Sequence, residues 1–314
     1  SAFQVYGIAL VYGATQATGF AAIGAAIAIS GASPLLLAGI GLMLVGLSFK
    51  VAAVPFHMWT PDVYEGAPAV VTTFMSVGAK AAGFAALVRV FFDAFHLLTP
   101  DWAPLMALFA VLSTIVGNVA AISQTSVKRM LAYSSIAHAG YVFLAVLPGG
   151  KGALSDFSAS AVIFYLAAYA LTNIGAWAVV MAVEKGEGMG SEISDYAGLA
   201  RTRPGLAMAM ALFMLSLTGL PPTMGFMAKF YVFSAALAAG YTWLVLVGVV
   251  TVLISAYYYL RVIVFMWMRA GAGLAVTPRP LNFTVALTAV ATLAFGLLPG
   301  PLMALVEDSV RGLF

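Results

Sequence analysis

The sequence predicts an all-α protein, a polytopic bundle of membrane-spanning helices. Hydrophobic residues make up 63% of the 314 residues and charged residues only 8%, whereas a soluble domain carries about 25% charged residues. Apolar runs of roughly 20 residues recur along the chain, and each can cross a hydrocarbon layer about 30 Å thick. The alternating ten-residue segments of a transmembrane barrel do not occur. Helices are therefore expected to cross the bilayer.

The apolar runs place the expected helices in chain order. A partial helix is expected up to about Ala14, and a Gly/Ala-rich connector then leads to Ser33. Because the first run is too short to span and the chain opens with Ser1, part of a longer protein is expected to precede it. Spans follow at about 34–58, 67–93, 102–123, 128–147, 157–184, 205–238, 241–268 and 282–306. The spans 205–238 and 241–268 are long enough to require tilting or a break.

Lysine and arginine residues in the short loops predict the orientation, because cytoplasmic loops carry the excess of both. One side collects seven of them, Lys128, Arg129, Lys185, Arg201, Arg203, Arg269 and Arg279, and the other collects Arg89, Lys151 and Arg311. The first side is therefore expected to be cytoplasmic, with the C-terminus on the opposite side. No basic tract with interleaved aromatics indicates a nucleic-acid partner. The absence of cysteine excludes disulfides and iron–sulfur ligation.

Three lysines, Lys50, Lys80 and Lys229, lie within predicted spans, while the Asp and Glu residues lie at or beyond span ends. A charged group at the centre of a span costs about 2.5–3.5 kcal/mol on insertion scales, so such residues are rare and usually functional. Lys80 is about 18 Å from either end of its span at 1.5 Å per residue, too far for its side chain to reach the headgroups. Lys50 is closer to an end of its span, about nine residues or roughly 13 Å from Trp59. The pattern indicates the handling of protons or cations.

Two of these lysines lie beside expected helix breaks. Pro55 cannot donate a hydrogen bond to the carbonyl of Val51, next to Lys50, and Pro221 and Pro222 release the carbonyls of Leu217 and Thr218 upstream of Lys229. Such carbonyls are tolerated at membrane depth only where protein or water satisfies them. A small hydrated cavity is therefore expected beside the lysines. An ordinary proline kink is the alternative, and for Pro55 alone it is equally plausible.

Polar residues at helical spacing accompany the lysines. Ser76 precedes Lys80 by one turn, and Ser134 shares a face with His138, with Tyr141 one turn further on. The unperturbed pKa of histidine is close to physiological pH, so His138 is a candidate proton relay, although a lone histidine in a bundle often only packs. Other mid-span polar groups are expected to form interhelical hydrogen bonds: Asn118, Tyr169 and Asn173.

Three long motifs resemble one known family. They are SFKVAAVPFHMWTPDVYEGAP at 48–68, QTSVKRMLAYSSIAHAGY at 124–141 and LTGLPPTMGFMAK at 217–229. All three resemble the antiporter-like, proton-translocating subunits of respiratory complex I, the NADH-quinone oxidoreductase. The WTPDVYEGAP segment and Lys229, where M-type subunits typically carry glutamate, resemble the N-type members. The resemblance extends over nearly the whole chain.

The resemblance implies a fold of two inverted five-helix repeats with two broken helices, of which this chain holds part of the first and all of the second. The implied divisions are a partial helix and connector (1–33), the rest of the first repeat (34–93), the second repeat (102–268) and a C-terminal helix (282–314). The family's glutamate partner of the lysine corresponding to Lys50 is not in this sequence.

The family's function implies that protons move along a chain of buried side chains while quinone is reduced elsewhere in the complex. The relay residues would be Lys50, Lys80, Lys229 and His138, supported by Ser76, Pro55, Pro221, Pro222 and Tyr141. No cofactor or metal is expected in this chain. The implied partners are the lipid bilayer, an M-type antiporter-like subunit and small membrane subunits, and the implied location is the bacterial inner membrane.

Two other functions fit parts of the pattern. A cation/proton antiporter subunit of the Mrp type shares this fold, although three lysines without an acid form a poor site for Na⁺. A structural spacer that only holds other subunits together is the second alternative. Sodium dependence would distinguish the first alternative, and normal pumping by lysine-to-methionine variants would indicate the second.

Overall fold

The structure, a computed structural model, describes residues 2–149, 152–184, 190–273, 275–276 and 278–312. These ranges are almost entirely helical and contain no strand, only an isolated bridge between Ser126 and Glu192. The longer helices are α1 (Ala2–Thr15), α2 (Phe20–Ser30), α3 (Pro34–Val51), α4 (Trp59–Gly66), α6 (Lys80–Arg89), α7 (Thr99–Ile122), α8 (Val127–Val146), α9 (Ala153–Val183), α11 (Pro204–Thr218), α12 (Met224–Ala238), α13 (Thr242–Met268), α14 (Arg279–Leu297) and α15 (Gly300–Arg311). The short elements are α5 (Ala69–Phe74), the π-helical turns η1 (Met75–Ala79) and η2 (Val90–Ala94), the 3₁₀ turns η3 (His96–Leu98) and η4 (Ile193–Tyr196), and α10 (Leu199–Thr202).

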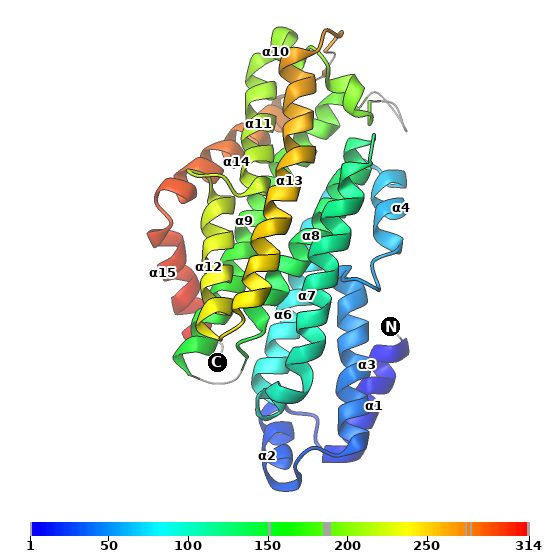
Figure 1. Cartoon of the computed structure of the whole chain (residues 1–314), viewed down its shortest axis with the longest axis vertical. Helices are drawn as coiled ribbons and strands as arrows, with labels where there is room; N and C mark the ends of the chain where they lie inside the picture. Colours follow the sequence, from blue (N-terminus) through cyan, green and yellow to red (C-terminus); the bar gives the residue numbers. More distant parts are fainter. Residues whose placement is uncertain (1, 150–151, 185–189, 274, 277, 313–314) are drawn as a thin grey trace.

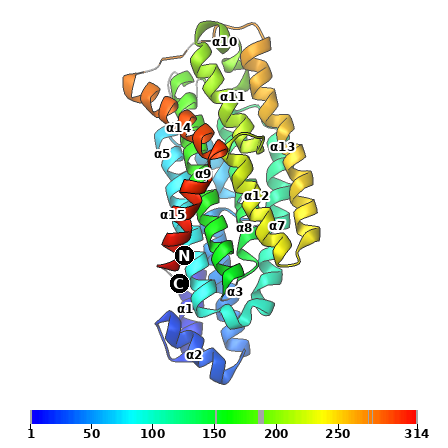
Figure 2. The same cartoon turned by 90° about the vertical axis from the view of Figure 1, so that its left-hand side faces the viewer.

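The helices form an elongated bundle (Figure 1). Among the described residues, six helical segments are long and apolar enough to cross a membrane, or seven if the bent pair α1 and α2 counts as one span: 34–51, 69–94, 96–122, 153–183, 242–268 and 279–297. α10, the end of α13 and the start of α14 lie at one end of the long axis, and α2 lies at the other (Figures 1 and 2). Arginines of the side predicted to be cytoplasmic, Arg201, Arg203, Arg269 and Arg279, are thus at one end. Lys151 and Lys185 lie outside the described residues.

Two expectations about the chain ends were wrong. The connector predicted over 15–33 contains helix α2, since alanine and isoleucine sustain a helix between Gly19 and Gly31. The single C-terminal helix is two helices, because Pro299 disfavours helical backbone at Leu298 and α14 stops at Leu297. In Figure 2, α14 and α15 lie over α9, and both pack against it.

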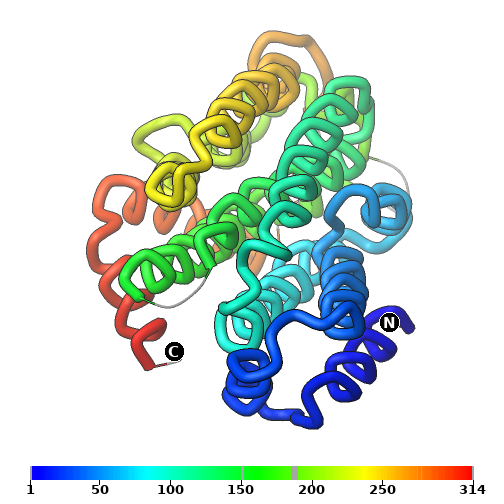
Figure 3. Tube along the Cα trace, turned by 60° about the horizontal axis from the view of Figure 1, so that its bottom comes forward, coloured from blue at the N-terminus to red at the C-terminus, as the bar shows by residue number. Residues whose placement is uncertain are grey.

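Helix α8 lies at the centre of the bundle. All of its residues except Arg129 and Tyr133 are buried. It packs against α7 and α9, with α4 and α12 covering other sides. The tilted view in Figure 3 shows the N-terminal helices on one side and the C-terminal helices on the other, with α7–α9 between them. Because α8 is enclosed by protein, it can carry polar residues that a lipid-facing helix would not tolerate.

A cluster of ion pairs lies at the start of α8. Lys128 Nζ pairs with Glu184 at 2.6 Å and donates to the Ala67 carbonyl at 3.3 Å. Arg129 pairs with Asp62 and Glu65 of α4, each at 2.8 Å. These contacts tie the start of α8 to α4, to the α4–α5 junction and to the end of α9.

The Lys128–Glu184 pair provides a stability test. Lys128 is 3% exposed and Glu184 18%, so Glu184→Ala would leave a buried ammonium without its counter-ion. Removing one partner of a buried pair costs roughly 3–5 kcal/mol, and the partial exposure of Glu184 favours the lower end of that range. We expect a clearly lower Tm of the purified assembly in thermal-shift measurements. Asp308→Ala is the control, because its 3.8 Å pair with Arg311 is exposed, and a similar Tm loss there would contradict the assignment.

Candidate functional site

Lys80 is the first residue of α6 and directly follows the π-helical turn η1. Its side chain is buried (3% exposed). The ammonium donates to the carbonyl and the hydroxyl of Ser135 on α8. The ring of Tyr169 on α9 lies 5.9 Å from Nζ, within reach of a cation–π contact. Three helices therefore surround this ammonium.

Lys229 lies on α12 at the broken helix and is also buried (5% exposed). Its ammonium donates to the carbonyls of Leu217 at 2.9 Å and Thr218 at 2.7 Å. These are the carbonyls that Pro221 and Pro222 were expected to release, so that expectation is confirmed. The lysine itself is the protein partner that satisfies them. Gly219, at φ +90°, allows this approach because it has no Cβ. A Cβ there would lie 2.8 Å from Lys229 Cδ and would obstruct the lysine side chain.

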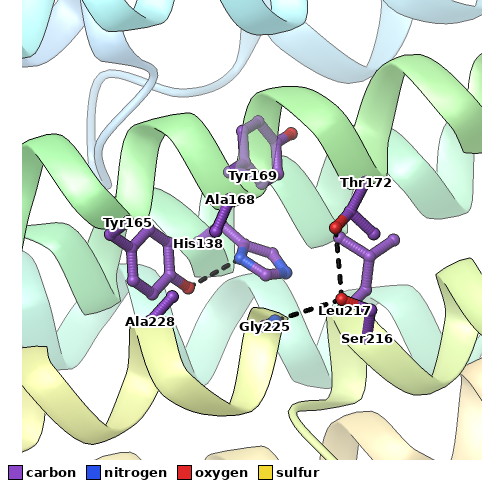
Figure 4. Close-up of a pocket in the computed structure, with 9 residues that line it drawn as sticks. All are labelled: His138, Tyr165, Ala168, Tyr169, Thr172, Ser216, Leu217, Gly225 and Ala228. Carbon is purple, nitrogen blue, oxygen red and sulfur yellow. Dashed lines mark hydrogen bonds between the residues drawn. The ribbon is translucent and has the colours of Figure 1, made fainter. Parts of the chain in front are cut away.

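His138 lies on α8 and has a hydrogen-bond partner for each ring nitrogen, of which Figure 4 shows the one from α9, Tyr165. Nδ1 is 2.7 Å from the Tyr165 hydroxyl of α9, and Nε2 is 3.3 Å from the Tyr259 hydroxyl of α13. Tyr259 also bonds Ser134, so the predicted shared face of Ser134 and His138 is confirmed by a common partner. The imidazole is thereby held in one orientation.

A small cavity beside His138 is lined both by a residue next to Lys80 and by residues next to Lys229. Its walls include Tyr169, which faces Lys80, and Leu217 and Ala228, which adjoin Lys229 (Figure 4). Thr172 and Ser216, hydrogen-bonded to each other at 3.1 Å, form the remaining polar wall. The cavity has room for about one water molecule, and its hydroxyl groups supply the partners that such a water needs.

A second polar network lies between α7, α8 and α13. The Asn118 amide donates to the Tyr141 hydroxyl at 3.1 Å and accepts from Tyr258 at 2.8 Å, and Tyr141 also meets Thr251 at 3.2 Å. The Tyr141 ring lies 4.8 Å from Lys229 Nζ. Asn118 thus forms the interhelical hydrogen bonds expected of it, and Asn173 does so as well, donating to Ser76 at 2.7 Å.

Lys80, His138 and Lys229, with the cavity between them, form the polar axis of the bundle. Other predicted site residues lie apart from this axis. Lys50 is exposed in the last turn of α3, and no hydrogen bond or ion pair to its ammonium occurs within the described ranges. Pro55 is exposed beyond the end of that helix, and Pro221 and Pro222 are exposed at the α11–α12 break. Ser76 bonds Asn173 and not Lys80, because the π-helical turn between them changes the helical register that we assumed.

Several residues of the site were not predicted from the sequence. Ser135, Tyr165 and Tyr259 touch Lys80 or His138 directly. Each lies in an apolar run where a serine or tyrosine looks like ordinary packing. Only the position of Ser135 beside Ser134 and three residues before His138 could have indicated a polar side of α8.

Two buried ammonium groups inside a bundle of apolar helices, one of them beside a broken helix, are typical of membrane proteins with an ion pathway. Residues 1–255 match the model of the transmembrane family of NADH:quinone oxidoreductases and Mrp antiporters. The chain belongs to this multi-pass membrane family.

Relatives and solved structures agree. The NADH-quinone oxidoreductase subunits N of Chloroflexus aggregans and Trichlorobacter lovleyi are 50% and 47% identical over 98% of this chain and 63% of each relative. Respiratory complex I from Thermus thermophilus with bound aureothin matches at TM-score 0.81 and 39% identity, over 96% of this chain and 65% of that chain. The Mrp complex of Dietzia sp. DQ12-45-1b matches at TM-score 0.86 but 22% identity, which shows the shared fold. The predicted N-type resemblance is confirmed, and the chain spans about 63% of the length of these curated relatives.

Proposed function

We propose that this chain is the larger part of a proton-translocating membrane subunit of an NADH-quinone oxidoreductase. One observation carries the proposal: Lys80 and Lys229 are both buried, and no carboxylate in the described part of the chain lies within ion-pair distance of either. The cavity beside His138 lies between the residues that surround the two lysines. An unpaired buried charge is costly, and proteins retain one in a membrane mainly where ions pass.

The contacts suggest the order of the groups along the path. Lys80 meets Ser135 and the Tyr169 ring, Tyr169 and His138 line the same cavity, and that cavity ends at Leu217, whose carbonyl accepts from Lys229. A water in the cavity would complete the connection. Lys50 would act at the exposed end of α3.

The remaining parts of the proposal come from the relatives. Quinone reduction would occur elsewhere in the complex, and this chain would hold no redox centre, cofactor or metal. M-type and small membrane subunits would be its neighbours in a bacterial inner membrane, since the relatives named above are bacterial.

Sodium dependence separates this function from the Mrp-type alternative. In sealed membrane vesicles that contain the assembled complex, we expect NADH oxidation to drive proton uptake at the same rate with and without Na⁺. Proton movement that requires Na⁺ would favour the antiporter, for which the described part of the axis offers ammonium groups and no carboxylate.

A substitution at His138 tests the middle of the path. His138→Gln retains hydrogen-bonding capacity for Tyr165 or Tyr259 but removes the imidazole, the titratable group in the middle of the proposed path. We expect proton translocation to slow by roughly 100-fold, the lower end of what one positioned proton-transfer group contributes. The measurement is the initial rate of NADH-driven acidification in vesicles with equal amounts of assembled complex. His96→Gln is the control because His96 lies in the η3 turn between helices. Unchanged rates in both variants would assign His138 to packing.

A further inference from the structure

The surface of the bundle contains a long apolar groove between α11 and α14. One wall is formed by Leu206, Met208, Ala209 and Leu212 of α11, and the other by Val285, Ala286, Ala289, Val290 and Leu293 of α14. Gly205 and Asn282 lie at its open end, and its volume is about 550 Å³. None of these residues takes part in the polar axis described above.

The length of the groove is close to the thickness of one leaflet of a bilayer. At 1.5 Å per residue, the wall from Asn282 to Leu293 is about 16 Å long, about half of a hydrocarbon layer roughly 30 Å thick. Near Leu293 the groove ends, because Gly296 lies against the carbonyl of Pro222, where a Cβ would be 2.2 Å from that oxygen. A partner helix that crosses the bilayer is about twice as long as this groove, whereas one acyl chain matches its length.

The open end of the groove is positively charged. Arg203 precedes α11 and Arg279 begins α14, both are exposed, and both helices begin at this end without a side-chain cap. Helix N-termini carry partial positive charge and favour anions. No Asp or Glu occurs between Asp195 and Glu307. Glu184 lines the neighbouring groove between α9 and α14, but its carboxylate is paired with Lys128 at 2.6 Å.

We propose that this groove binds an acyl chain of an anionic membrane phospholipid, whose phosphate lies between Arg203 and Arg279. The length of the groove accounts for the acyl chain, and the two arginines account for the headgroup. The proposal is independent of the proton path, because the groove and the axis share no residue.

Photolabelling of the assembled complex tests the proposal. The complex is placed in phosphatidylcholine nanodiscs with a trace of phosphatidylglycerol that carries a diazirine in one acyl chain, and labelled peptides are identified by mass spectrometry. We expect labelling of 205–212 and 282–293 to exceed that by diazirine-phosphatidylcholine roughly tenfold or more, since each arginine near a surface attracts anionic lipid. Equal labelling by both probes, or no labelling of the two segments, would overturn the proposal.

Two variants separate the headgroup from the acyl chain. The double variant Arg203→Gln and Arg279→Gln should lower the phosphatidylglycerol signal to the phosphatidylcholine level, and Ala289→Trp should fill the groove and lower both. Leu253→Trp is the control, because Leu253 is 70% exposed on α13 and outside the groove. The arginine variant alters only exposed side chains, so it remains informative if Ala289→Trp fails to assemble. Displacement of the probe by millimolar inorganic phosphate would indicate a simple anion site and would contradict the proposal.

Discussion

Lys80→Met is expected to abolish proton translocation while the assembly remains intact. Methionine is close to lysine in length and fills the same space, and replacing a buried charge by an apolar group is often neutral or stabilising. The thioether cannot hold a proton, so the path from Ser135 toward His138 loses its titratable group. The measurement is the proton gradient formed per NADH oxidised in sealed vesicles, corrected for the amount of assembled complex.

Arg311→Met is the matched control for Lys80→Met. Arg311 is 74% exposed on α15, far from the axis, and the same loss of one positive charge there should leave the gradient unchanged. A normal gradient per NADH in Lys80→Met would refute the relay. If Lys229→Met behaved normally as well, the chain would be a structural spacer.

Gly225→Ala is expected to have the largest effect on the structure. A Cβ at position 225 would lie 1.8 Å from the carbonyl oxygen of Ser216 on α11, a backbone atom that no rotamer change can move. The two halves of the broken helix would have to separate, and the carbonyls of Leu217 and Thr218 would leave Lys229. Overpacking costs typically about 1–3 kcal/mol, and a clash with backbone belongs at or above the upper end. We expect a lower Tm, less assembled complex and loss of the proton gradient.

Gly41→Ala controls for the change of residue type. Gly41 lies within α3, and a Cβ at this position would meet open space, with no neighbouring atom within 4 Å. Alanine should therefore be accepted there, and its higher helix propensity should leave stability equal or slightly raised. Equal Tm values for both variants would show that α11 and α12 do not meet as closely as Gly225 and Ser216 indicate.

The sequence predicted the broken helix and its lysine because both depend on local chemistry. Proline cannot complete the helical hydrogen bonds, and this alone identified the Leu217 and Thr218 carbonyls, to which Lys229 donates. The burial of Lys80 was predicted for a similar reason, since its distance from either helix end depends only on the length of the apolar run.

The partners across helices were not predictable in the same way. Tyr259 reaches His138 from 121 residues further along the chain, and Tyr165 from 27 residues away. Such pairs depend on how helices pack, which periodicity within one helix does not reveal. The π-helical turn before Lys80 was missed because an apolar run with one extra residue in a turn looks the same as a regular helix.

The acceptors of the Lys229 ammonium are main-chain oxygens, and this affects how the site can vary among related proteins. No substitution at Leu217 or Thr218 removes a peptide carbonyl, so a change of side chain there leaves the acceptors of the ammonium in place. Loss of these contacts by substitution is therefore expected at the lysine itself and at the prolines and glycines that shape the surrounding backbone.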